Sequence, residues 1–139
     1  MAIDVKDCVF NKEEIFSLYE DAGWTNYTSR PGMIEKAYAN SLCVLAAYID
    51  GKLAGIIRAA GDGASILFIQ DIIVFRKYQR QGIGTALIKA MLERYPDVYQ
   101  TELLTDNTEK TVKFYESIGF RRALSMNCEA FILLKNMQH

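Results

Sequence analysis

The stretch covering residues 67–94 constrains the fold most, because it joins a strand, a glycine-bearing turn and a helix in one run. Residues 69–74 form an apolar run of strand length that is rich in β-branched side chains. Beyond the turn, apolar residues recur at the spacing of one helix face, and they are Ile83, Ala86, Leu87, Ala90 and Met91. We therefore predict a buried strand that leads directly into the N-terminus of an amphipathic helix.

The turn itself reads Gln79-Arg80-Gln81-Gly82-Ile83-Gly84. Backbone N–H groups and the positive end of a helix dipole meet there, which suits a pyrophosphate. The string is not a P-loop, and it is not a dinucleotide fingerprint, because the third residue after Gly84 is Leu87 rather than glycine. An ordinary strand-to-helix turn that contains glycine is the alternative interpretation of these residues alone.

A second motif begins at Asp106 and reads DNTEKTVKFYESIGF. Asp106 or Asn107 is a potential cap for a helix over residues 108–118, and Gly119 stands where a helix-terminating glycine is expected. The apolar residues of this segment fall on one helical face. This predicts a second amphipathic helix, followed by a strand that starts at Phe120.

Together, Q-x-x-G-x-G at Gln79–Gly84 and F-Y-x-x-x-G-F at Phe114–Phe120 resemble the two signatures of the GNAT superfamily of N-acetyltransferases. The resemblance implies one α/β domain over residues 1–139. Its mixed, mostly antiparallel sheet is expected to have about six to seven strands, with a central parallel pair splayed open and about four flanking helices. The strand and helix order of the remaining chain fits this architecture.

Individual elements can be assigned from pattern and turn residues. Asp50-Gly51 is a strong two-residue hairpin signal, and Asn11 is a helix N-cap candidate. The remaining connection at residues 24–32 is predicted to be a loop. We predict strands over 3–10, 41–49, 53–60, 69–74, 99–105, 120–126 and 130–134, and helices over 12–22, 33–39, 83–94 and 108–118.

The resemblance also implies an acyl-CoA donor and a set of residues that bind it. Backbone groups near Ile73 and Val74 would bond the pantetheine arm, while the turn would hold the diphosphate. The expected turn contacts are Gln79, Arg80, Gln81, Gly82, Ile83, Gly84 and Thr85. Many relatives carry Asn seven residues before the motif tyrosine, but here that position is Thr108, and Asn107 is one residue early. Either residue is a cofactor candidate, and Asn107 is alternatively a helix cap.

Two residues are candidates for the chemical steps of acetyl transfer. Tyr115 occupies the position of the family's general acid, which protonates the leaving thiolate, although it is also consistent with a core aromatic. Asp71 is the acid within the central strand run and is our candidate general base. A carboxylate that merely satisfies backbone N–H groups is the competing interpretation of Asp71. A water molecule would then take the amine proton.

The acceptor amine is expected to bind near the first helix and the loop after it, where Trp24, Tyr27 and Tyr19 offer aromatic surface. Aromatic faces attract cations such as an ammonium group. The same aromatic residues would equally pack the loop onto the sheet. The sequence does not distinguish a small amine from a protein amine.

Composition limits the other function classes. The formal net charge of −1 argues against nucleic acid or a membrane surface as partner. Three widely spaced cysteines and one histidine predict no metal site. We expect a cytoplasmic protein, monomeric or homodimeric, that acetylates a primary amine from acetyl-CoA by direct attack in a ternary complex. The alternatives are an acyl-CoA-binding regulatory module without turnover, and nucleotide binding at the glycine turn.

Overall fold

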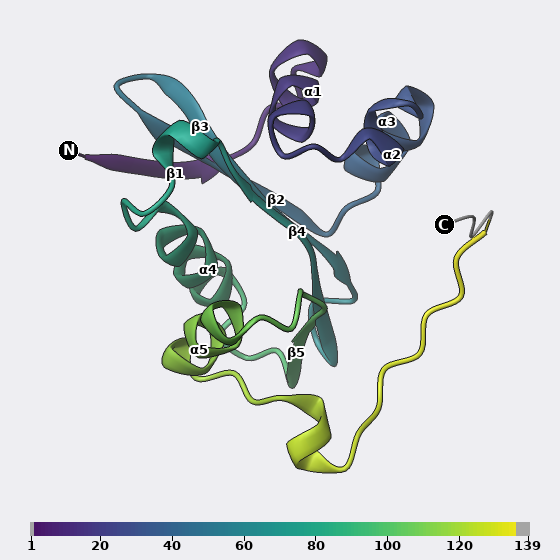
Figure 1. Ribbon diagram of the computed structural model, residues 1–139. Coiled ribbons are helices and arrows are strands. Elements are labelled where there is room, and N and C mark those ends of the chain that lie inside the picture. The colour runs from purple at the N-terminus through teal and green to yellow at the C-terminus, as the bar shows by residue number, and fades with distance from the viewer. Residues whose placement is uncertain (1, 136–139) are drawn as a thin grey trace. The chain divides into compact units, whose positions relative to one another are not determined.

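The computed structural model describes residues 2–135, and the chain clusters into two compact units that divide after Leu104. The first unit is built on a five-stranded sheet in the order β1-β2-β3-β4-β5 (Figure 1). All neighbouring strands are antiparallel except β4 and β5, which are parallel. The strands are β1 (Ile3–Asp7), β2 (Cys43–Ile49), β3 (Lys52–Gly61), β4 (Ile66–Val74) and β5 (Gln100–Leu103).

Helices lie on both faces of this sheet. Figure 1 shows α1, α2 and α3 on one side and α4 on the other, where α4 contacts the first four strands. The helices are α1 (Lys12–Asp21), α2 (Thr25–Thr28), α3 (Pro31–Ala39) and α4 (Ile83–Arg94), with a 3₁₀ turn η1 (Arg76–Tyr78) before α4. The mixed α/β sheet with a single parallel pair is the architecture that the sequence predicted.

Several local predictions are confirmed in detail. The Asn11 side chain accepts a hydrogen bond from the Glu14 N–H at 3.1 Å, so Asn11 caps α1. Asp50 and Gly51 have φ of +51° and +78°, as a type I′ hairpin turn between β2 and β3 requires. Residues 24–32 are not simply a loop, however. They contain α2, and α3 begins at Pro31 because proline is favoured at the first helical position.

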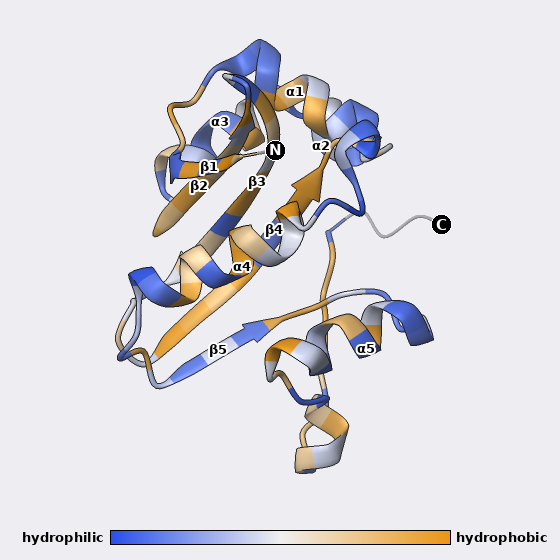
Figure 2. Ribbon diagram, turned by 90° about the vertical axis from the view of Figure 1, so that its left-hand side faces the viewer, coloured by the Kyte–Doolittle hydropathy of each residue, from blue (hydrophilic) through white to orange (hydrophobic). Residues whose placement is uncertain are grey.

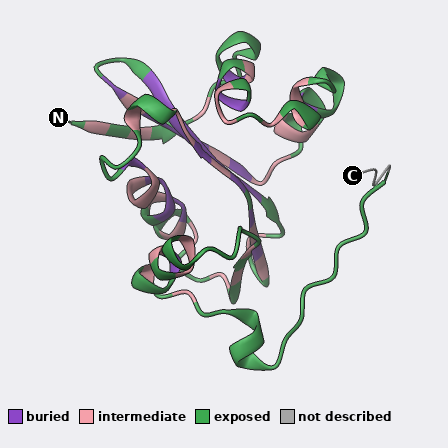
Figure 3. Cartoon of the chain, in the orientation of Figure 1, coloured by how far each residue is buried: buried purple, intermediate pink, exposed green. Residues whose placement is uncertain are grey.

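The core of the first unit fills both sides of the sheet. Ile15, Leu18 and Ile34 of the helices pack with Ile56 and Ile73 of the strands. On the other side, α4 buries Ile83, Leu87, Ile88 and Met91. Figure 2 shows hydrophobic colour concentrated on the central strands, and Figure 3 shows the same strands buried. Each fully buried aliphatic side chain contributes about 1.5 to 3 kcal/mol relative to exposure.

The second unit contains α5 (Glu109–Ile118) and the 3₁₀ turn η2 (Ala123–Met126). Thr108, rather than Asp106 or Asn107, caps α5, because its Oγ1 accepts a hydrogen bond from the Thr111 N–H at 3.3 Å. Asp106 in turn accepts hydrogen bonds from the Thr108 N–H and hydroxyl at 3.0 and 2.7 Å. Gly119 follows α5 in the left-handed conformation, as predicted.

The predicted strands at 120–126 and 130–134 are wrong for the described residues, so the sheet has five strands rather than six or seven. Backbone hydrogen bonds explain the first of them. The N–H groups of Ser125, Asn127 and Cys128 donate to carbonyls three to five residues back, which uses the backbone groups that a hairpin ladder needs. Across residues 2–135, no helix has the length and apolarity to cross a membrane.

Candidate active site

The glycine turn has the backbone geometry of an anion-binding helix start. Arg80 and Gly82 both adopt left-handed conformations, with φ of +65° and +83°. Gly82 is the N-cap of α4, and no described side chain caps this end of the helix. The first helical hydrogen bond runs from the Ala86 N–H to the Gly82 carbonyl at 3.0 Å. The preceding N–H groups, those of residues 83 to 85, are therefore directed out of the helix end.

Beside this turn, β4 extends beyond its parallel partner. Pairing of β4 with β5 ends at Ile69 and Leu103, whereas β4 continues to Val74. The Phe75 N–H donates to the Ala54 carbonyl of β3 at 2.9 Å. Because backbone groups alternate along a strand, those of Ile73 also face β3, and those of Val74 face the open edge. The predicted parallel pair is thus present, at one end of the described sheet rather than at its centre, and Val74 rather than Ile73 presents its amide at the open edge.

A side chain links the turn to this open edge. The Gln79 amide nitrogen donates to the Val74 carbonyl at 3.2 Å. Gln79, Arg80, Gln81 and Gly82 are exposed, Gly84 and Thr85 are half-buried, and Ile83 is buried under the sheet. The first unit thus brings together the turn residues and Val74, leaving the side chain of Ile83 with a core role.

Tyr115, Asn107 and Thr108 belong to the second unit. Tyr115 is buried, with the rings of Phe114 and Phe120 packed edge-on at centroid distances of 5.0 and 5.8 Å. Burial raises the pKa of the Tyr115 phenol above its usual value, although a hydrogen bond with Thr105 acts in the opposite direction. Asn107 is exposed and Thr108 caps the helix, so the capping role predicted as an alternative for Asn107 is wrong.

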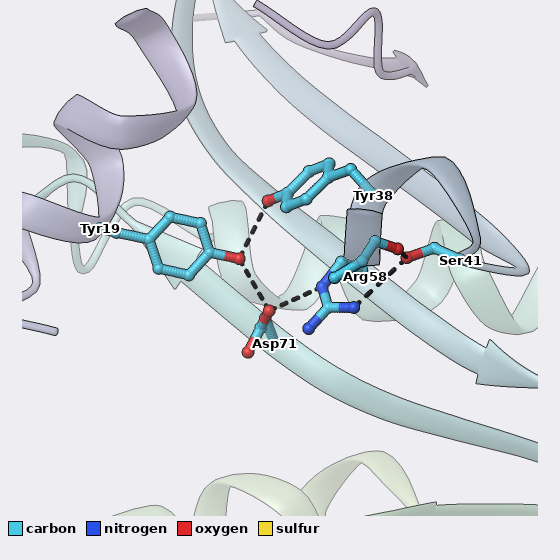
Figure 4. A network of polar contacts seen from close by, with 6 residues as sticks. Tyr19, Tyr38, Ser41, Arg58 and Asp71 are labelled. Carbon is cyan, nitrogen blue, oxygen red and sulfur yellow. Dashed lines mark hydrogen bonds and ion pairs between the residues drawn. The ribbon is translucent and has the colours of Figure 1, made fainter. Parts of the chain in front are cut away.

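Asp71 lies in a buried polar network rather than against backbone N–H groups (Figure 4). Its Oδ2 accepts a hydrogen bond from Arg58 Nε at 2.8 Å and one from the Tyr19 hydroxyl at 2.7 Å. Asp71 is 2% exposed and Arg58 is 8% exposed, so the ion pair is shielded from water. Figure 4 shows the second carboxylate oxygen of Asp71 pointing away from both partners.

Further hydroxyl groups extend this network. The Tyr19 and Tyr38 hydroxyls lie 3.0 Å apart, and Arg58 Nη1 donates to Ser41 Oγ at 3.3 Å. Burial and the nearby Asp71 charge raise the pKa of Tyr19. Burial lowers the pKa of Arg58, but the charge and hydrogen bond of Asp71 outweigh it, so the net shift is upward. The Tyr19 phenol and the Arg58 guanidinium therefore both stay protonated, and Arg58 is the buried cation of the network.

A bulge in β4 places Asp71 opposite Arg58. Arg58 pairs with Asp71 and the next β3 residue, Ala59, pairs with Ile69, so Gln70 is an extra, exposed residue. Bulges commonly re-aim side chains beside functional sites. Sequence reasoning missed Arg58 and Tyr38. The usable signal was that Arg58 and Asp71 are lone opposite charges within apolar runs that a hairpin-connected sheet places side by side.

The predicted acceptor aromatics pack on the first helix. Tyr19 lies 5.8 Å from Trp24 and 5.3 Å from Tyr27 between ring centroids, and Trp24 and Tyr27 are themselves 5.8 Å apart. Tyr19 is 1% exposed and offers no free surface to an acceptor, which corrects its expected role. Trp24 and Tyr27 are half-buried against the core. They therefore attach the α2 segment to the core and remain partly exposed.

No group of three or more His, Cys, Asp or Glu side chains within residues 2–135 is arranged to hold a metal ion. The described site therefore consists of backbone amides, an open strand edge and a neighbouring polar network.

Comparisons with known proteins agree with this arrangement. A GNAT-family acetyltransferase of Streptococcus pneumoniae has a solved structure that superposes with a TM-score of 0.87, at 38% identity over 97% of this chain and 99% of that one. The Arabidopsis thaliana GCN5-related N-acetyltransferase 2, chloroplastic, is 38% identical over 73 residues, half of this chain. A glucosamine 6-phosphate N-acetyltransferase of Trypanosoma brucei brucei is 34% identical over 59 residues, 42% of this chain.

The matches span 27% and 40% of the length of those two curated relatives. The family profile described as "Acetyltransferase (GNAT) domain" matches residues 9–139, which is nearly the whole chain. The chain therefore belongs to the GNAT family of acetyltransferases.

Proposed function

We propose that this protein transfers an acetyl group from acetyl-CoA to a primary amine by direct attack in a ternary complex. Within residues 2–135, the observation that carries the proposal is the N-terminus of α4, which no side chain caps, beside the end of β4, where the strand edge opposite β3 has no strand partner. The helix N-terminus suits an anionic diphosphate, and the strand edge suits a chain of amides. An acyl-CoA thioester carries a diphosphate followed by the amides of its pantetheine arm.

The N–H groups of residues 83 to 85 are proposed to bind the diphosphate, assisted by the helix dipole. The left-handed Gly82 keeps a side chain away from the approach to these groups. Arg76, Lys77 and Arg80 are exposed nearby and supply positive charge for the phosphates. In this proposal, the backbone N–H groups form the hydrogen bonds that hold the diphosphate, and the basic side chains attract it electrostatically.

The amide of Val74 is proposed to bond the pantetheine arm. Its carbonyl already accepts the Gln79 side chain, so Gln79 orders the open edge before the donor binds and yields the carbonyl when it does. A strand edge that offers N–H and C=O groups recognises an extended ligand in the manner of an added strand. Ile73 would contribute its side chain to the core rather than its amide to the donor.

In the reaction, the neutral amine nitrogen attacks the thioester carbonyl carbon, and the C–S bond breaks as the tetrahedral intermediate collapses. Holding both reactants in attack geometry supplies much of the acceleration. An amine with a pKa of about 10.4 costs roughly 4 to 5 kcal/mol to deprotonate at neutral pH, so a group that accepts its proton is useful. We assign that proton to the second oxygen of Asp71 or to water.

Tyr115 is proposed to donate its phenolic proton to the departing CoA sulfur. Because its pKa is raised, the phenol does not release a proton in advance. The transfer must accompany the growth of negative charge on sulfur as the C–S bond breaks. The thiol of CoA and the acetylated amine are then the products.

The test is a thiol-release assay with purified protein, acetyl-CoA and a panel of amines. The panel contains glucosamine 6-phosphate, an arylalkylamine, a free peptide N-terminus and a lysine side chain. Release of CoA thiol that depends on one of these amines supports the proposal. Binding of acetyl-CoA without amine-dependent release would instead support a regulatory module, and protection by ATP alone would support nucleotide binding.

Replacing Gly82 with aspartate is expected to weaken acetyl-CoA binding by about tenfold or more, equivalent to about 1.4 kcal/mol. A carboxylate at the α4 N-terminus repels the diphosphate and competes for the same N–H groups. The measurement is the dissociation constant from calorimetry. Gly51→Asp is the matched control, because Gly51 also has a positive φ, +78°, and a Cβ added at either glycine would meet no other atom within 4 Å. Equal losses of affinity in both variants would remove the turn from the donor site.

A further inference from the structure

One side chain ties the approach to α4 to a helix that is distant in sequence. Residues 76–82, here called the connecting turn, begin with η1 and end at the N-cap of α4. The carboxylate of Asp21, the last residue of α1, accepts a hydrogen bond from the Arg76 N–H at 2.8 Å. Asp21 therefore joins the C-terminal end of α1 to the start of the connecting turn.

The other hydrogen bonds of the connecting turn are local. The Tyr78 N–H donates to the Phe75 carbonyl at 2.8 Å, and the main chain and side chain of Gln79 bond within residues 74–79. In the part of the chain that the structure describes, the bond to Asp21 is the hydrogen bond that joins the connecting turn to a separate element. The position of the turn relative to α1 therefore depends on this carboxylate.

The backbone of the connecting turn needs external support. Arg80 is a non-glycine residue with a φ of +65°, in the left-handed region that such residues rarely adopt. A strained conformation of this kind persists where the surrounding structure holds it. Because the turn leads directly into α4, a shift of its backbone would also move the N–H groups at the start of that helix.

Asp21 does not favour α1 itself. A negative charge is unfavourable in the last turn of a helix, and the last turn of α1 contains no basic residue. Arg76 supplies positive charge there, since a Cβ added at Gly23, just beyond α1, would lie 3.9 Å from Arg76 Nη2. The N–H group and the guanidinium of Arg76 thus both lie at the C-terminal end of α1.

We propose that Asp21 is a positioning residue for the donor site, because it holds the connecting turn where the N–H groups of residues 83–85 meet the diphosphate. This inference rests on the proposed function. The same helix carries Tyr19, whose hydroxyl donates to Asp71 at 2.7 Å. One helix therefore fixes the donor turn through its last residue and the buried polar network through Tyr19.

The first experiment is calorimetric titration of full-length protein with acetyl-CoA. Asp21→Ala is expected to weaken binding by about five- to tenfold, the effect of losing one hydrogen bond. Asp21→Asn keeps an oxygen that accepts the Arg76 N–H and is expected to bind as tightly as wild type. Glu20→Ala is the matched control, because Glu20 is the exposed neighbouring acid of α1, and its side chain makes no hydrogen bond or ion pair within residues 2–135.

The sign of the change separates positioning from simple electrostatics. A carboxylate near a diphosphate repels it, so removal of the charge alone would strengthen binding. The tie to Arg76 predicts the opposite for Asp21→Ala. Unchanged or stronger binding in Asp21→Ala, or an equal loss in Asp21→Asn or Glu20→Ala, overturns the proposal.

The second experiment needs no donor and measures amide hydrogen exchange in the free protein. The N–H groups of Tyr78 and Gln79 do not bond to Asp21, yet their exchange is expected to accelerate severalfold in Asp21→Ala and to stay at the wild-type rate in Asp21→Asn. Wild type that binds acetyl-CoA, with unchanged exchange in Asp21→Ala, overturns this inference alone. Wild type that binds no acetyl-CoA contradicts the proposed function and overturns this inference with it.

Discussion

Replacing Asp71 with alanine is expected to lower the free energy of unfolding by about 3 to 5 kcal/mol. The substitution leaves Arg58 as a buried cation without its 2.8 Å partner and removes the carboxylate acceptor of the Tyr19 hydroxyl. Breaking a buried ion pair is costly because the remaining charge has neither water nor a counter-charge. Urea denaturation followed by circular dichroism measures the change.

The matched control is Asp7→Ala, which removes the carboxylate of a second Arg–Asp pair. Arg94 and Asp7 lie 2.6 Å apart, but their side chains are 44% and 72% exposed. An exposed pair of this kind contributes about 0 to 1 kcal/mol. If Asp71→Ala cost no more than Asp7→Ala, the buried network would have no special role in stability.

A double substitution separates the charge from the packing. Arg58→Met combined with Asp71→Leu is expected to recover most of the loss caused by Asp71→Ala, because a buried ion pair and an apolar pair of similar volume are often nearly equal in stability. Unfolding energies of wild type, Arg58→Met, Asp71→Leu and the double variant give the coupling between the two side chains. A double variant as unstable as Asp71→Ala would point to a shape requirement instead.

Replacing Tyr115 with phenylalanine is expected to reduce turnover by about 10²-fold or more while acetyl-CoA affinity stays unchanged. The substitution removes the proposed proton donor and keeps the ring that packs between Phe114 and Phe120. Tyr99→Phe is the control, because Tyr99 is 86% exposed and loses the same atom. Turnover of Tyr115→Phe within a few-fold of wild type would exclude the phenol from the chemical step.

The pH dependence provides a second readout of the same residue. An acid whose pKa is raised above its usual value stays protonated to higher pH, so Tyr115 remains competent throughout the neutral and mildly alkaline range. Turnover in wild type should therefore rise as the acceptor amine loses its proton, with no matching fall from loss of the acid below pH of about 10. A descending limb near neutrality would require a different donor.

Local signals explain why much of the first unit could be predicted from sequence. The strand at 69–74 and the helix that follows carry periodic patterns that any stable packing must respect, and Asp50-Gly51 fits one hairpin turn. The prediction of two C-terminal strands was wrong, because an apolar run such as residues 130–134 forms a strand only where a neighbouring strand pairs with it. Within the described residues, local 3₁₀ hydrogen bonds at Ala123–Met126 take precedence.

The site was predicted less completely than the fold. The turn residues and the open edge follow from a contiguous motif, so their positions could be inferred together. Asp71 was noticed as a lone acid, but its partner Arg58 is 13 residues away and becomes adjacent through strand register and a bulge. Register of that kind depends on the packing of both sheet faces, which a single sequence pattern does not specify.

Calorimetric titration of the full-length protein with acetyl-CoA tests the proposed donor site most directly. We predict saturable heat for one site in each chain, with similar heat for CoA and with affinity reduced by Gly82→Asp but retained in Gly51→Asp. The absence of heat with both acetyl-CoA and CoA, in protein that shows a cooperative unfolding transition, would contradict binding of an acyl-CoA at the start of α4.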